Sequence, residues 1–123
     1  MTKPYRLEFE INALPSSPNT LLGAHWTVRS SHAKKWLRMV DVATMGKRPA
    51  TALIRAVVRL ERHSSKEPDA DNGRLSFKCI LDALVKLGVL HDDRPSVIGE
   101  PVYVWRAAPM RKGKVRVRVE SVE

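Results

Sequence analysis

The pattern of apolar and polar residues predicts four β-strands. From Tyr5 to Asn12 every second residue is apolar, which is the period of a strand with one buried face. Alternation or a high content of β-branched residues also favours strands over three later stretches. These are residues 52–62, 97–107 and 115–120. A basic turn, residues 110–114, separates the last two strands, so we expect them to form a hairpin with a basic tip and outer face.

Two stretches carry apolar residues at the spacing of a helix with one buried face. The first runs from Ser31 to Met45, with Ser30 or Ser31 as its N-cap and basic residues on its outer side. The second begins after Asn72 and ends before Gly88, which stands where a C-terminal glycine is favoured. Its predicted buried stripe consists of Phe77, Ile80, Leu81, Leu84 and Leu87.

The predicted order of elements, β-α-β-α-β-β, describes a mixed α/β (α+β) fold. We expect a small mixed sheet of about four strands with two main helices packed on it. A chain of 123 residues has the length of one domain, and it contains no internal repeat or low-complexity segment. The predicted domain therefore spans residues 1–123.

Composition narrows the class of protein. The formal net charge of +9 favours a polyanionic partner such as nucleic acid, although an inert basic surface is also open. A single cysteine, Cys79, excludes an intramolecular disulfide and suits a reducing compartment. No run approaches the length of a membrane helix, and we expect the first residues to lead into a strand and not to form a signal peptide. We expect a cytoplasmic protein with no membrane partner and no organic cofactor.

Acidic residues gather in the stretch 68–72, Pro-Asp-Ala-Asp-Asn, between the second strand and the second helix. They would repel the phosphates that a basic protein attracts, unless they bind a divalent cation such as Mg²⁺ or Mn²⁺. Side chains two apart on extended backbone point to one side, so Asp69 and Asp71 can face one point. Lys78 follows Asp71 by two helical turns on the same face, and Asp92-Asp93 comes just after the helix.

Simpler explanations of these acidic residues remain open. In one, Asp69 and Asp71 belong to an ordinary solvated loop. In another, Asp71 or Asn72 caps the helix while Asp69 faces its positive end. A calcium-binding EF-hand loop is excluded. Counted from Asp69, Gly73 would occupy its fifth position and Ile80 its twelfth, where a bidentate glutamate is required.

Several spaced elements of this region together resemble the RusA family of Holliday junction resolvases. They are the acidic stretch 68–72, Phe77-Lys78, the segment 81–84 (Leu-Asp-Ala-Leu) and the turn 88–93 (Gly-Val-Leu-His-Asp-Asp). The family carries a D-x-D-N motif, a lysine four residues before D-A-L or D-G-L, and a G-x-x-x-D-D turn. The resemblance covers about residues 68–105 and is looser before them, where Asn19 follows a proline-rich turn.

The resemblance implies a RusA-like fold and a homodimeric, Mg²⁺-dependent endodeoxyribonuclease, with Mn²⁺ as a substitute metal. Such an enzyme resolves four-way DNA junctions by paired symmetric nicks during recombination and repair, in a bacterial or phage-infected cell. The family's catalytic, metal-binding aspartates correspond to Asp69, Asp71 and Asp93, and its essential lysine corresponds to Lys78. Asp92 is a candidate additional ligand, or a group that orients one.

The chain departs from the family in the stretch between Asn72 and Lys78. This stretch is about one helical turn longer than in the founding bacterial enzyme, and Gly73 replaces the usual apolar residue. An added turn keeps the lysine on about the same face of the helix. We therefore expect Lys78 to stabilise negative charge on the phosphate while a metal-activated water attacks it.

Basic residues on the first helix and near the last strand are expected to hold the DNA through phosphate contacts. They are Lys34, Lys35, Arg38, Arg111, Lys112, Lys114 and Arg116. A two-fold dimer would suit a four-way junction, because two active sites can make paired nicks. The alternative is a non-catalytic basic protein that binds branched DNA, and metal-dependent strand scission distinguishes the two.

Overall fold

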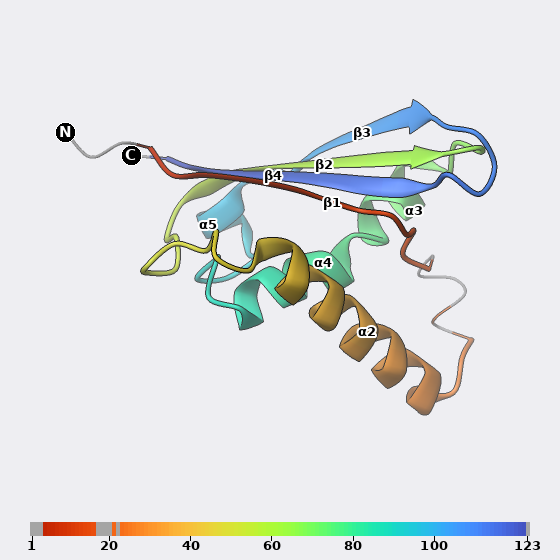
Figure 1. Ribbon diagram of the computed structural model, residues 1–123, viewed down its shortest axis with the longest axis horizontal. Coiled ribbons are helices and arrows are strands. Elements are labelled where there is room, and N and C mark those ends of the chain that lie inside the picture. Colours follow the sequence, from red (N-terminus) through yellow and green to blue (C-terminus); the bar gives the residue numbers. More distant parts are fainter. Residues whose placement is uncertain (1–3, 17–20, 22, 123) are drawn as a thin grey trace.

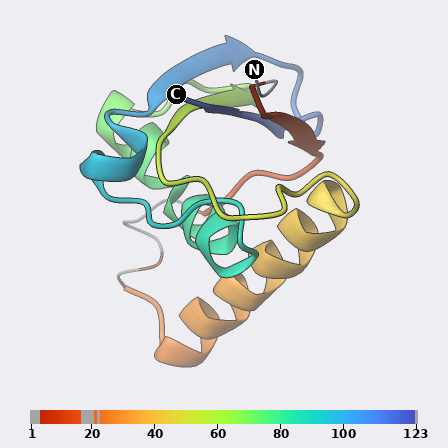
Figure 2. The same cartoon turned by 90° about the vertical axis from the view of Figure 1, so that its left-hand side faces the viewer.

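The computed structural model describes residues 4–16, 21 and 23–122. They fold into a four-stranded mixed sheet with helices on one face (Figures 1 and 2). The strands are β1 (Arg6–Ile11), β2 (Ala56–Ser64), β3 (Val102–Ala107) and β4 (Lys114–Ser121). The helices are α2 (Trp26–Thr44), α3 (Ala70–Leu75), α4 (Lys78–Lys86) and α5 (Pro95–Ile98). The predicted mixed α/β class is confirmed. Within these ranges no helix is both long enough and apolar enough to cross a bilayer.

The strand order, β1-β4-β2-β3, contradicts the predicted hairpin of the last two strands. Strand β4 lies between β1 and β2 and is antiparallel to both, whereas β3 pairs with β2 in parallel. The connection 108–113 therefore crosses the end of β2. Val115, Val117 and Val119 of β4 are fully buried, which suits a strand paired on both edges, and β3 is left as an edge strand.

The core lies between the inner face of the sheet and the two longer helices. Alternate residues of β1, β2 and β4 point inward, as predicted, and meet Trp36 and Val40 of α2 and Ile80 and Leu84 of α4. The buried apolar strand residues are Leu7, Phe9, Ile11, Ala56, Val58, Leu60, Val115, Val117 and Val119. Burial of each large side chain contributes about 1.5–3 kcal/mol, so this layer supplies the main stabilisation of the fold.

Helix α2 begins five residues before the predicted start at Ser31. Its N-cap is His25, whose ring Nδ1 accepts a hydrogen bond from the backbone N–H of Thr27 at 3.2 Å, so the predicted serine cap is wrong. The apolar pattern misses this extension because Trp26 and Val28, in the first turn, are exposed and belong to no buried stripe. The predicted C-terminal boundary is confirmed within one residue.

The second predicted helix is divided into α3 and α4. The division falls at Ser76 and Phe77, where the Ser76 hydroxyl donates to the carbonyl oxygen of Gly73 at 2.6 Å. The predicted apolar stripe is confirmed, with Leu87 half-buried and its other members buried. Gly88 ends α4 with φ +80°, a conformation that glycine adopts without strain. The acidic motif therefore lies on a separate short helix.

Two predicted strands begin later than expected. β2 starts at Ala56 and not at residue 52, and Ile54 before it is 71% exposed. β3 starts at Val102 and not at residue 97, because Val97 and Ile98 are buried as part of the short helix α5. An apolar pair of β-branched residues does not distinguish a strand from one buried helical turn.

Close contact between β3 and α3 explains the glycine at position 73. A Cβ atom added to Gly73 would lie 2.2 Å from Oη of Tyr103 and 2.5 Å from its Cζ. The Tyr103 ring also meets Phe77 edge-on, with 6.1 Å between ring centroids. No side chain larger than hydrogen fits at position 73 while Tyr103 holds this position, so this contact places α3 against the sheet.

We therefore expect Gly73→Ala to lower the free energy of unfolding by about 1–3 kcal/mol, the usual cost of overpacking. In a Tyr103→Val background the clash is gone, and alanine should instead stabilise the helix by about 0.5–1 kcal/mol. Urea unfolding of the wild type, both single variants and the double variant measures this reversal. An equal cost of Gly73→Ala in both backgrounds would contradict it.

Candidate functional site

The acidic motif begins the short helix α3, directly after the loop that follows β2. Asp69 occupies the N-cap position, but its carboxylate makes no capping hydrogen bond. Asp71 lies in the first turn, and its side chain is 87% exposed. Asn72 is also inside the helix, so the interpretation of Asp71 or Asn72 as the N-cap is wrong. Both aspartate side chains are thus presented to solvent, and capping does not account for them.

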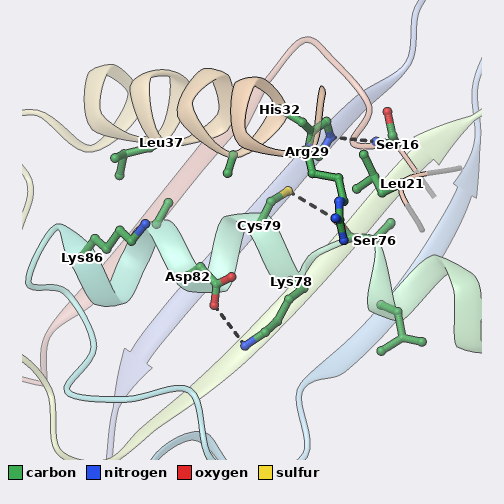
Figure 3. Close-up of a pocket in the computed structure, with 13 residues that line it drawn as sticks. Ser16, Leu21, Arg29, His32, Leu37, Ser76, Lys78, Cys79, Asp82 and Lys86 are labelled. Carbon is green, nitrogen blue, oxygen red and sulfur yellow. Dashed lines mark hydrogen bonds and ion pairs between the residues drawn. The ribbon is translucent and has the colours of Figure 1, made fainter. Parts of the chain in front are cut away.

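Lys78, at the start of α4, lies between two carboxylates from different parts of the chain. Its Nζ is 3.0 Å from Oδ1 of Asp82, one turn further along α4, and it also donates a hydrogen bond to Oδ2 of Asp93 in the α4–α5 connection (Figure 3 shows the Asp82 contact). The hydrogen bond to Asp93, opposed by partial burial and assisted by Asp82, raises the pKa of the Lys78 ammonium. This contact brings together two elements of the sequence motif.

Arg74 of α3 makes a second bridge of the same kind. Its guanidinium is 2.9 Å from Oε1 of Glu100, just before β3, and 3.5 Å from Oδ1 of Asp71. Sequence reasoning missed Glu100, because 26 residues separate it from Arg74 and no motif marks it. The spacing of Asp71 and Arg74, three apart on a helix, was the one available signal.

Together, Arg74 and Lys78 gather acidic side chains from three segments around two cations. The segments are α3, α4 and the stretch 93–100 between α4 and β3. Each of these ion pairs is at least partly exposed and is expected to add only about 0–1 kcal/mol to stability. The main effect of the arrangement is therefore to hold the carboxylates as two pairs, one around Arg74 and one around Lys78, with their charge partly compensated.

The metal-binding role predicted for Asp69, Asp71 and Asp93 stays a prediction. In the part of the chain that the structure describes, no three His, Cys, Asp or Glu side chains lie close enough together to hold a metal ion. The chemistry of the donors fits Mg²⁺, since all three offer carboxylate oxygens and two of them are exposed. Two of the three already face a cation of the protein, Asp93 the ammonium of Lys78 and Asp71 the guanidinium of Arg74.

Asp92, the candidate additional ligand, is engaged within its own turn. One carboxylate oxygen accepts the backbone N–H of Asp93 at 2.7 Å, and the other lies 2.7 Å from Nε of Arg94. The bond from Asp93 and the charge of Arg94 lower the pKa of the Asp92 carboxyl. These contacts stabilise the turn that carries Asp93, so in this structure the Asp92 carboxylate holds the backbone of that turn.

The predicted DNA-binding residues fall into two groups. Five of them are exposed and lie outside the sheet, three on α2 and two in the β3–β4 connection: Lys34, Lys35, Arg38, Arg111 and Lys112. The other two, on β4, face a carboxylate across the sheet, because Oε1 of Glu10 lies 3.5 Å from Lys114 and 2.6 Å from Arg116. The charge of these β4 residues is partly compensated within the protein.

A cleft of about 350 Å³ separates α2 from α4 close to Lys78 (Figure 3). Cys79 points into it from α4, whereas Lys78 and Asp82 point away from α2. Burial raises the pKa of the Cys79 thiol to about 12, so the thiol stays protonated and unreactive near neutral pH. Lys78 and Asp82 line the edge of the same cleft, so the charged side of α4 borders it directly.

No protein-family model matches the chain, and no curated protein is significantly similar to it. The resemblance to the RusA family therefore rests on the spaced motifs alone, two of whose residues, Lys78 and Asp93, are in contact in the fold. Asn19, the loosest element of the resemblance, lies outside the described residues.

The lowered pKa of Asp92 predicts a pH-dependent contribution to stability. A carboxyl whose pKa is lower in the folded than in the unfolded chain stabilises the fold above its ordinary pKa of 3.8, and this contribution disappears as pH falls through the folded value. Asp92→Asn removes the charge and keeps an oxygen that accepts the Asp93 N–H. We expect its deficit in unfolding free energy, measured in urea, to be constant above about pH 5 and to shrink toward pH 3.

Asp92→Ala serves as the matched comparison, because it removes the acceptor as well as the charge. Its deficit should include a part that persists at low pH. A deficit of Asp92→Asn that does not change with pH would show that the carboxylate charge is not what stabilises the turn.

Proposed function

We propose that this protein is a Mg²⁺-dependent, structure-specific endodeoxyribonuclease that resolves four-way DNA junctions by paired nicks. The observation that supports this most is the contact between Lys78 and Asp93, because these residues are 15 positions apart and belong to separate elements of the motif. Asp69 and Asp71 begin the helix immediately before α4. Chance similarity of spacing would not require such residues to meet.

In this proposal Asp69, Asp71 and Asp93 hold the metal through their carboxylates. The bound metal supplies an activated water and stabilises the charge that develops on the leaving oxygen. Lys78 places a positive charge beside Asp93, where it can stabilise the extra negative charge on the scissile phosphate. The α3–β3 contact at Gly73 and Tyr103 keeps the helix that carries Asp71 in place.

The exposed basic residues are proposed to hold the DNA next to this site. α3 follows the end of β2, and Arg111 and Lys112 follow the end of β3. Because β2 and β3 are parallel, both connections leave the same end of the sheet, so a bound phosphate backbone can reach both. We propose a cytoplasmic homodimer, since two copies related by a two-fold axis could nick opposite strands of one junction.

The decisive variant is Asp71→Asn, which removes one carboxylate charge with almost no change of shape. With Mg²⁺ and a labelled synthetic four-way junction, we expect symmetric nicks by the wild type and a loss on the order of 10²–10³-fold in the variant. Junction binding, measured by gel shift, should stay close to that of the wild type, because the basic residues supply the affinity.

The matched control is Glu67→Gln, which removes a carboxylate from the exposed loop just before the motif and should cleave normally. EDTA should abolish cleavage, and a linear duplex of the same sequence should stay intact. Full cleavage by Asp71→Asn would overturn the proposed site. Tight junction binding without scission in Mg²⁺ or Mn²⁺ would favour the alternative, a non-catalytic protein that binds branched DNA.

The two groups of basic residues should differ in their effect on DNA binding. Replacing exposed Arg111 and Lys112 by glutamine should reduce the slope of log K against log salt by about 0.9 for each phosphate that the variant no longer neutralises. Arg116→Gln should change the slope less, since that guanidinium already faces Glu10. Junction titrations at several salt concentrations measure both slopes. A larger effect of Arg116→Gln would place the DNA on the outer face of the sheet.

A further inference from the structure

We infer that Asp82 is a positioning residue that holds the Lys78 ammonium whenever Asp93 binds the metal. This inference rests on the proposed function and concerns a residue to which the metal-binding motif assigns no role. The observation behind it is the position of one ammonium group between two carboxylates, Oδ1 of Asp82 at 3.0 Å and Oδ2 of Asp93 in direct hydrogen-bond contact.

A metal ion and the ammonium compete for Asp93. In this structure the Lys78 ammonium compensates the charge of the Asp93 carboxylate. Of the two carboxylates that Lys78 contacts, Asp93 is the less exposed, with 21% of its side chain accessible against 49% for Asp82. If Asp93 held a divalent cation, repulsion between the two positive charges would weaken the contact of the ammonium with that carboxylate. The free energy of metal binding therefore includes the cost of releasing Lys78.

Asp82 lowers that cost because its contact with Lys78 does not depend on the segment that carries Asp93. The two residues are one turn apart on α4, so the helix itself keeps them adjacent. Figure 3 shows both side chains on the side of α4 that faces away from α2, and the ammonium therefore stays on the side where Asp93 lies. A small shift of the ammonium toward Asp82 leaves it paired and near the phosphate site.

This positioning role gives Asp82 a specific energetic signature. Without the Asp82 carboxylate, a displaced ammonium has no second partner, so Lys78 stays on Asp93 and opposes the metal more strongly. The effect of Asp82 on metal binding must therefore pass through Lys78 and vanish when the ammonium is absent. A carboxylate that attracted or bound the metal itself would act whether or not Lys78 carried a charge.

The test is a double-mutant cycle on metal binding by the free protein, without DNA, with Mn²⁺ affinity measured by electron paramagnetic resonance. We expect Asp82→Asn to weaken Mn²⁺ binding by about five- to tenfold, the range of a modest coupling between sites. Asp82→Glu should restore most of the affinity. In a Lys78→Gln background, Asp82→Asn should change the affinity less than about twofold.

Each other outcome decides the question. An equal loss in both backgrounds would make Asp82 a metal-attracting or metal-binding group and overturn the positioning role, as would no loss in either. Failure of the wild type to bind Mn²⁺ at millimolar concentration would overturn the proposed function and this inference with it. Binding by the wild type that Asp82→Asn leaves unchanged would overturn the inference alone. Thermal unfolding by circular dichroism confirms that each variant keeps its fold, and Glu67→Gln controls for the loss of one exposed charge.

Discussion

The parallel pairing of β2 with β3 is the constraint from which the rest of the arrangement follows. A parallel pair cannot be joined by a tight turn, so the chain must cross back over the sheet before β3 begins. Every acidic residue of the candidate site lies in that crossover, residues 65–101. Within it, α4 packs its apolar side against the sheet. The packing of α4 against the sheet therefore stabilises the fold and also fixes the position of the charged side chains on the other side of α4.

Charge compensation within the crossover follows a simple pattern. Arg74 and Lys78 each contact one carboxylate on their own helix and a second one on the segment 93–100. Pairs with this much exposure are weak, as the proposed exchange of partners on metal binding requires. On the outer face of the sheet, Glu10 of β1 pairs with basic residues of β4. Positive charge is therefore partly compensated on this face, and the net positive charge is not spread evenly over the surface.

The local sequence pattern predicted which strands and helices form better than it predicted which of them lie side by side. The alternation in β1 and β4, the stripe of α4 and the glycine that ends it are confirmed because each depends on which face of one element is buried. The predicted hairpin is wrong because the partners of a strand depend on the whole sheet. The inward face of β4 is apolar enough for β4 to lie between two other strands, and the six residues before it can cross the end of β2. The N-cap of α2 failed because a histidine ring replaces the usual serine.

For the site, the sequence by itself determined which residues are candidates for the proposed chemistry: the acidic motif, the lysine on its helix face and the acidic pair after the helix. The tertiary structure alone decided which of them meet, because a contact between Lys78 and Asp93, or between Arg74 and Glu100, depends on how the crossover folds back. It also decided why position 73 is glycine, since the tyrosine that fills that space is thirty residues away on β3. Periodicity specifies which face a residue occupies, whereas packing between distant segments specifies what it touches.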